Sequence, residues 1–211
     1  MNRRGIALLN TGFVLLAIAG SVATTVRQSE THSAPAAESV ASDSAFPTRV
    51  VDGRTEVRDK SGHWLTLRRF DRIASGSTIA DELLLEFCEP DRIVAFTKFS
   101  QENEFRAHQF AGRPHLSALD DLETLIALRP DLLLLNTLGS GTKVSRLREA
   151  GIVVFDLGEM RGVPGFVDNA RVIAKLVGKP ALGERYAKQF VRRLERVAAE
   201  ARGADRADAA Y

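Results

Sequence analysis

The sequence predicts an α/β fold, with a parallel-sheet lobe flanked by helices, an N-terminal β-hairpin and a long C-terminal helix. Two short apolar runs, Leu132–Leu135 and Ile152–Phe155, have the length of buried strands, and an amphipathic pattern ending at Gly151 lies between them. Short apolar strands alternating with helices are typical of βαβ units, whose strands run parallel. An apolar stripe at helical spacing from Leu182 to Ala201 predicts one long helix near the C-terminus.

Residues 1–23 are predicted to be a secretory signal peptide. Arg3 and Arg4 form a charged start, a mostly apolar stretch follows, and Ser21-Val22-Ala23 offers the small residues that a signal peptidase recognises. We expect cleavage near Ala23. An uncleaved membrane anchor is the alternative, although the apolar run is shorter than the ~20 residues that a span needs. Because no cysteine directly follows the run, we expect no lipid anchor.

The next segments are a tether and the start of the lobe. Residues 24–48 are rich in Ser, Ala, Thr and Glu without helical or alternating period, so we expect them to be a disordered tether. The α/β lobe is predicted at residues 49–178, with ordered sequence beginning near Arg49. It opens with a β-hairpin, because Arg54–Arg58 and His63–Leu67 flank a turn signal.

The first βα unit of the sheet follows the hairpin. Arg72–Ser75 is predicted to be a strand that breaks at Gly76-Ser77 and leads into the helix Ile79–Phe87. Thr78 and Asp81 form an imperfect capping box for this helix, because a short polar side chain at the N-cap binds a backbone N–H of the first turn.

The remaining elements are less regular until the C-terminal helices. Arg92–Phe96 is the next predicted strand, and Thr97–Leu119 is irregular, with a short helix around Glu102–Gln109. Pro164–Val177 is predicted to be a helix stopped by Gly178. The long helix is expected at residues 179–203, followed by a tail at residues 204–211.

Composition excludes some classes of function. The chain is 45% hydrophobic and 27% charged, with a formal net charge of +2. Leaving out Arg3 and Arg4, 27 Lys and Arg stand against 27 Asp and Glu, so no broad basic surface for nucleic acid is expected. Cys88 is the single cysteine, so it cannot pair within the chain. It is expected to be a small core residue.

Motifs for nucleotide, metal and covalent chemistry are weak. Gly139-Ser140-Gly141 follows a strand, but Val144 stands where a dinucleotide fingerprint needs its third glycine. His108 and His115 could join Glu102 or Glu104 on a divalent metal, although the spacing matches no standard site. No Ser/His/Asp or Cys/His set stands out. We therefore expect no enzyme activity, no cofactor and no metal.

Four segments carry a resemblance to a known family. They are Arg72–Ser75 with Thr78–Leu83, Asp91–Ala95, Leu122–Leu132, and Leu147–Val154. In this order they resemble the first lobe of the class III periplasmic solute-binding proteins of ABC importers, which deliver cobalamin, iron-siderophores, haem or metals. The resemblance covers roughly Arg54–Ala201.

The resemblance implies a two-lobed protein with its ligand in the cleft between the lobes. One long helix joins the lobes in that family, and residues 179–203 resemble this connector helix. A second lobe would follow the helix, so we expect the chain to be partial or truncated, with one wall of the cleft. Because pockets normally bury most of a ligand's surface, we expect no tight binding by these residues alone.

The cleft wall is expected at the carboxyl ends of the strands, where open parallel sheets bind ligands. Backbone amides at the helix start suit an anionic or carboxamide group. Lys98 could face an acidic ligand, and Phe99 could cover a ring. Simple capping for Thr78 and a solvated lysine remain alternatives. The predicted ligand-binding residues are Gly76, Ser77, Thr78, Lys98, Phe99, Thr137, Leu138, Gly139 and Glu159.

Glu123 is the predicted contact with a permease. In better-known members of the family, the glutamate of this motif lies on the outer tip of the lobe and pairs with permease arginines, so the resemblance implies the same role for Glu123. The alternative is structural, because Glu123 stands three residues after Asp120, the spacing of a capping box.

These predictions together favour a solute-binding component of an ABC importer in the periplasm, secreted with its signal peptide cleaved. It would capture an iron complex, cobalamin or haem, and its partners would be that small ligand and an ABC permease. Two alternatives remain open: an exported α/β interaction domain without solute binding, and an exported α/β enzyme.

Overall fold

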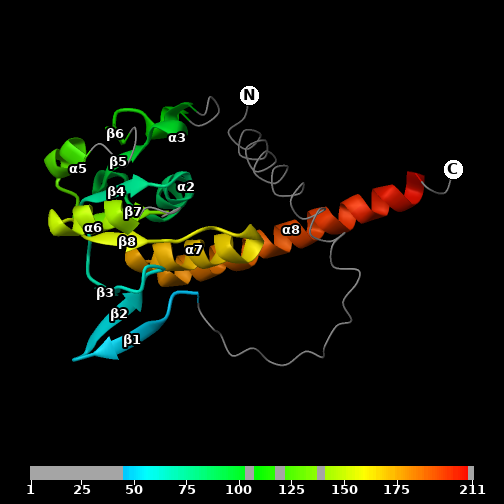
Figure 1. Ribbon diagram of the computed structural model, residues 1–211. Coiled ribbons are helices and arrows are strands. Elements are labelled where there is room, and N and C mark those ends of the chain that lie inside the picture. The colour runs from blue at the N-terminus through cyan, green and yellow to red at the C-terminus, as the bar shows by residue number, and fades with distance from the viewer. Residues whose placement is uncertain (1–44, 103–106, 117–121, 137–140, 209–211) are drawn as a thin grey trace.

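The computed structural model describes residues 45–102, 107–116, 122–136 and 141–208. Its strands form two sheets, a small antiparallel one near the N-terminus and a larger parallel one (Figure 1). Predictions for the signal peptide, for most of the tether and for Thr137, Leu138 and Gly139 lie outside these residues. Among the described residues, none of the helices combines the length and apolar character needed to cross a bilayer.

The small sheet contains the predicted hairpin and one further strand. Its strands are β1 (Thr48–Val51), β2 (Arg54–Arg58) and β3 (Trp64–Thr66), in the order β1-β2-β3. The sequence did not indicate β1, because all four of its residues are exposed and no alternation marks it. Phe46 is only 3% exposed and lies in the core, so ordered structure begins before Arg49, inside the range assigned to the tether.

The predicted parallel sheet is confirmed. It consists of β4 (Ile73–Gly76), β5 (Ile93–Thr97), β6 (His115–Leu116), β7 (Leu132–Leu135) and β8 (Val154–Asp156). The order is β6-β5-β4-β7-β8, and every neighbouring pair is parallel. All strands of this sheet therefore point the same way, and their carboxyl ends lie along one edge.

Helices and one 3₁₀ turn lie between and after these strands. They are α2 (Thr78–Phe87), the 3₁₀ turn η1 (Pro90–Arg92), α3 (Lys98–Glu102), α4 (Ala107–Phe110), α5 (Leu122–Leu128), α6 (Gly141–Glu149), α7 (Gly162–Leu176) and α8 (Pro180–Asp208). The short helix expected around Glu102–Gln109 is described in part: α3 starts directly after β5 and ends at Glu102, and α4 begins at Ala107. Residues 103–106 lie outside the described residues. Cys88 is buried at the end of α2, as expected.

Two hydrophobic cores cover the two faces of the parallel sheet. Successive side chains of a strand point to opposite faces. In β7 this places Leu132 and Leu134 in the core with α2 and α7, and Leu133 and Leu135 in the core with α5 and α6. All four leucines are 0% exposed, because helices cover both faces. This explains why β7 is a continuous apolar run.

The long C-terminal helix is one continuous element. α8 packs along α7 and then projects past the lobe (Figure 1). It runs to Asp208, so the segment from residue 204 is helical rather than the tail that we expected. Tyr186 packs edge-on against Phe87, with ring centroids 5.2 Å apart, and thereby joins α8 to α2.

The β2–β3 turn fastens the small sheet to the lobe. The Lys60 amide donates to the Asp156 carbonyl at 2.9 Å, so the turn covers the outer edge of β8. Covering an edge strand protects it from pairing with other chains. Gly158, with φ of +67°, allows close approach here, because a Cβ at this position would lie 2.6 Å from Cγ of Lys60.

Candidate functional site

The candidate site is the edge of the parallel sheet at the carboxyl ends of its strands. Gly76 at the end of β4 pairs with Leu135 of β7, and Leu135 pairs with Asp156 of β8. This register brings the predicted ligand-binding residues after β4, β5 and β8 to the same edge. We call the described ones the binding rim: Gly76, Ser77, Thr78, Lys98, Phe99 and Glu159.

The rim segment after β4 is held by a helix cap. Ser77 is buried in the extended conformation of an N-cap residue, and its hydroxyl accepts from the Ala80 amide of α2 at 3.5 Å. The predicted capping box of Thr78 and Asp81 is therefore wrong. Thr78 is the exposed first residue of α2, and its side chain is on the surface of the rim. Gly76 is half-buried.

The rim segment after β5 presents an exposed aromatic ring. Phe99 is 59% exposed, in contrast to the buried phenylalanines of the core. Nζ of Lys98 lies 5.4 Å from its ring centroid, close enough for a cation–π contact. Both residues lie in the first turn of α3 rather than in a loop. This pair offers an apolar face beside a positive charge.

A buried carboxylate links the segments after β4 and β5. Asp81 of α2 is 0% exposed and accepts from the Thr97 amide at 3.1 Å and from the Thr97 hydroxyl at 2.5 Å. It also accepts from the Ser100 hydroxyl. Burial raises the pKa of Asp81, and hydrogen bonds from Ser100, Ser75 and Thr97 act in the opposite direction. The sequence did not indicate this linkage, because Asp81 suited a local cap.

The remaining predicted ligand-binding positions follow β8 and β7, and only the one after β8 is described. Glu159 after β8 is exposed, and its carboxylate accepts from Arg161 at 2.6 Å and 2.9 Å. Its charge is therefore partly balanced before any ligand arrives. Thr137, Leu138 and Gly139 after β7 lie outside the described residues. Ser140, the centre of the Gly-Ser-Gly motif, does so as well.

Glu123 was predicted to contact a permease rather than the ligand. It is exposed in the first turn of α5, the helix that precedes β7, and so it is accessible to a partner. Asp120, its possible capping partner, lies outside the described residues.

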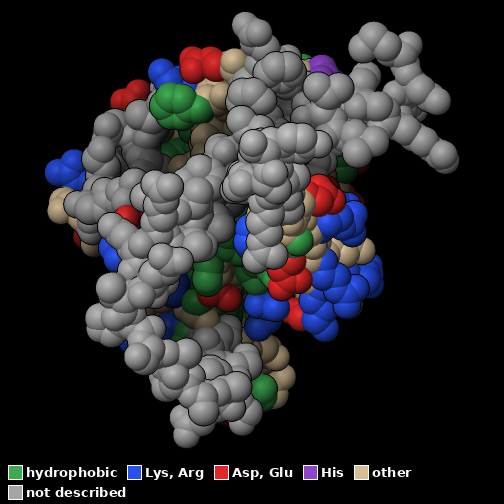
Figure 2. Space-filling model, turned by 90° about the vertical axis from the view of Figure 1, so that its right-hand side faces the viewer, with side chains coloured by type: hydrophobic (Ala, Val, Ile, Leu, Met, Phe, Trp, Pro, Cys, Tyr) green, Lys and Arg blue, Asp and Glu red, His purple; other side chains and the backbone are tan. Residues whose placement is uncertain are grey.

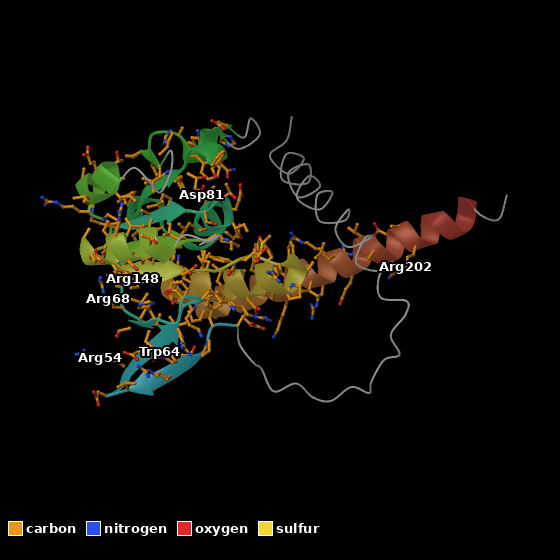
Figure 3. The ribbon with its side chains drawn as sticks, viewed as in Figure 1. Arg54, Trp64, Arg68, Asp81, Arg148 and Arg202 are labelled. Carbon is orange, nitrogen blue, oxygen red and sulfur yellow. The ribbon has the colours of Figure 1, made fainter. Side chains whose placement is uncertain are left out.

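The histidines do not form a metal site within the described parts of the chain. His108 is exposed in α4 and His115 is half-buried in β6. Among the described residues, no three His, Cys, Asp or Glu side chains lie close enough together to hold a metal ion. Glu104 lies outside those residues. Trp64 belongs to the small sheet, where the Arg49 guanidinium lies 4.0 Å from its ring centroid, away from Asp81 and the rim (Figure 3).

The face seen along the projecting end of α8 carries mixed charges. Figure 2 shows Lys and Arg side chains gathered together with acidic ones on one side of this face. Interspersed charges of both signs produce no extended field of one sign. The charges on this face thus agree with the balanced composition.

Comparison with protein families gives one match over most of the chain. The model that describes periplasmic binding proteins matches residues 73–211, from the start of β4 onward. A cobalamin-binding protein of Halobacterium salinarum is 25% identical over 111 residues, which cover 53% of this chain and 30% of that protein.

Solved structures share the fold. A periplasmic haem-binding protein from Pseudomonas aeruginosa superimposes with a TM-score of 0.57 at 21% identity, covering 65% of this chain and 49% of that one. A periplasmic solute-binding protein from Veillonella parvula gives a TM-score of 0.55 at 17% identity, covering 65% and 45%. The chain spans less than half the length of these structures and about a third of its curated relative.

Proposed function

Because the chain belongs to the periplasmic binding protein family, we propose that it is a solute-binding component of an ABC importer that captures cobalamin, haem or an iron-siderophore. The observation that carries this proposal is the family match over residues 73–211. The similar proteins are a cobalamin-binding protein, a periplasmic solute-binding protein and a periplasmic haem-binding protein. That favours the binding role over the exported enzyme.

The binding rim supports a ligand with a flat or apolar surface. The Phe99 ring is exposed at the carboxyl edge of the sheet, where ligands of open α/β sheets bind. Lys98 beside it suits an acidic group on such a ligand. In this proposal the rim is one wall of the binding cleft, and the second wall comes from another lobe connected through α8.

The proposed location is the periplasm, after removal of a signal peptide. The proposed partner is an ABC permease that contacts Glu123. A glutamate that meets arginines gains charge-assisted hydrogen bonds but loses hydration, so this contact would contribute specificity more than affinity. An interaction domain without solute binding remains the second candidate, because exposed Glu123 would serve that role equally well.

Titration with candidate ligands tests the proposal. Trp64 is poorly placed to report, so the protein should carry Trp64→Phe and Phe99→Trp, with quenching measured against hemin, cyanocobalamin and a ferric siderophore. We expect saturable binding of at least one ligand, on the order of micromolar or weaker, because a single wall buries less of the ligand. Absorbance titration of the unmodified chain provides an independent signal.

A matched pair of variants makes the result specific. Phe99→Ala should weaken binding measured by ligand absorbance. Ile126→Ala should not, although Ile126 is also a large exposed apolar residue, at 48%, because it lies on α5. If a folded protein shows no saturable response to any of the three ligands, solute capture is wrong for this chain. Nanomolar binding would instead contradict the single-wall interpretation.

A further inference from the structure

The attachment of α3 to the lobe is unusual, because it relies on polar contacts. α3 has only five residues, too few to be stable by its own hydrogen bonds. Among its described side chains Ser100 is buried, at 5% exposure, whereas Phe99 and Glu102 are exposed and Lys98 is half-buried. Apolar burial therefore does little to hold this helix.

The buried contact of α3 is with Asp81. The Ser100 hydroxyl donates to the Asp81 carboxylate, which also accepts both the amide and the hydroxyl of Thr97, the last residue of β5. Asp81 thus holds the end of the strand and the start of the helix at once. The Ser75 hydroxyl donates to the Ser77 carbonyl beside it, which stabilises the neighbouring rim segment.

Burying a carboxylate is costly unless hydrogen bonds satisfy it. A leucine at position 81 would fit the apolar environment of α2 without this cost, but it would leave the Thr97 amide and two hydroxyls without an acceptor. The Asp81 carboxylate accepts from the Thr97 amide, the Thr97 hydroxyl and the Ser100 hydroxyl, all in the segment that carries Lys98 and Phe99, and Ser75 of β4 also stabilises its charge. Most of its hydrogen bonds therefore serve the placement of that segment.

We propose that Asp81 is a positioning residue that fixes α3 and so sets where Lys98 and Phe99 meet the ligand. This inference rests on the proposed solute-binding function and deepens it. It states that a residue outside the binding rim determines where the rim residues Lys98 and Phe99 lie. Loss of the Asp81 contacts should free α3 while the sheet remains intact.

Hydrogen exchange tests the placement of α3 without any ligand. In Asp81→Ala, amides of residues 97–102 should exchange at least tenfold faster than in the parent protein, while those of β4 and β7 keep their protection. Leu84→Ala is the matched control, because Leu84 is a fully buried residue of the same helix and contributes to the apolar core. It should not loosen residues 97–102 selectively.

A milder variant guards against failure to fold. Ser100→Ala removes one donor and leaves the Asp81–Thr97 contacts in place, so it should still raise exchange in α3. If neither variant accelerates exchange at residues 97–102, or if Leu84→Ala does so equally, the positioning role is wrong.

Ligand affinity provides the second measurement. With hemin or cyanocobalamin, whichever the parent chain binds, Asp81→Ala and Ser100→Ala should weaken affinity at least fivefold. Asp81→Asn retains an acceptor for the Thr97 amide and should fall between them and the parent. Faster exchange with unchanged affinity would overturn the inference. A parent chain that binds neither probe would instead refute solute binding, and hydrogen exchange would still decide whether Asp81 places α3.

Discussion

Arg148 of α6 and Asp59 of the β2–β3 turn form an ion pair, with 2.7 Å between the Arg148 Nη2 atom and the Asp59 Oδ2 atom. The Asp59 side chain is 1% exposed and the Arg148 side chain 22% exposed. Asp59 also accepts from the Ser61 hydroxyl and the His63 amide, each at 2.8 Å. The small sheet precedes residue 73, where the family match begins, so this pair joins the small sheet to the matched part of the chain.

Arg148→Ala should destabilise the protein by about 3 kcal/mol, because it leaves the buried Asp59 carboxylate without its cation. Arg171→Ala is the control, since Arg171 pairs with Glu184 on the surface, where both side chains are more than 40% exposed. Its cost should stay below about 1 kcal/mol. Urea unfolding measures both values. Equal losses in the two variants would contradict the buried-pair interpretation.

Sequence patterns predicted the elements that carry strong apolar signals. β7 and β8 are short and apolar, and the stripe on α8 has a clear helical period, so their type was predictable. β1 and β6 were missed. β1 is exposed throughout, and β6 has two residues, so both depend on neighbouring strands for their conformation. Pairing partners are a tertiary property that one segment does not encode.

The position of the rim residues at the strand ends was predictable, but the contacts that hold them in place were not. The carboxyl ends of parallel strands fixed which residues lie on the rim. The cap was assigned one residue too late, because Ser77 and Thr78 are both good caps and the choice depends on β4 extending to Gly76. Asp81 was assigned to the cap as well, whereas its partners Thr97 and Ser100 lie 16 and 19 residues away.

Glu89 should make stability depend on pH in strongly acidic solution. Hydrogen bonds from Lys179 and then Arg92 lower its pKa to about 2. Because the folded pKa is depressed, the stabilisation is complete above the ordinary pKa of about 4.5 and is lost as pH falls toward about 2. In Glu89→Gln, the midpoint of unfolding should therefore change less with pH between about 4.5 and about 2 than in the parent protein.

The size of the Glu89 effect should be modest, because its side chain is 47% exposed and solvent screens the pair. Added salt should reduce the difference between Glu89→Gln and the parent. Glu86→Gln is the control, because Glu86 is also exposed and lies three residues earlier, near the end of α2. An identical pH profile for the parent and Glu89→Gln would show that the pair contributes nothing to folding.

Glu123 should govern partner binding and leave ligand capture unaffected. Glu123→Arg reverses an exposed charge on α5, so its affinity for the permease should fall at least tenfold, because like charges would face each other across the contact. Glu86→Arg makes the same charge change on α2 and should have little effect. Surface plasmon resonance against the purified permease in nanodiscs measures both. Unchanged affinity for Glu123→Arg would remove this residue from the docking surface.

Replacing either of two helical glycines with alanine should change the stability of the protein, and the two changes should have opposite signs. A Cβ on Gly183 of α8 would lie 2.4 Å from the Ala174 Cβ of α7, so Gly183→Ala must push the helices apart, at a cost of about 1–3 kcal/mol. A Cβ on Gly165 of α7 meets no atom closer than 3.5 Å, so Gly165→Ala should gain up to about 1 kcal/mol from helix propensity. Thermal unfolding of both variants measures the two signs. If Gly183→Ala is also stabilising, α7 and α8 do not need the close approach that directs α8 along the lobe.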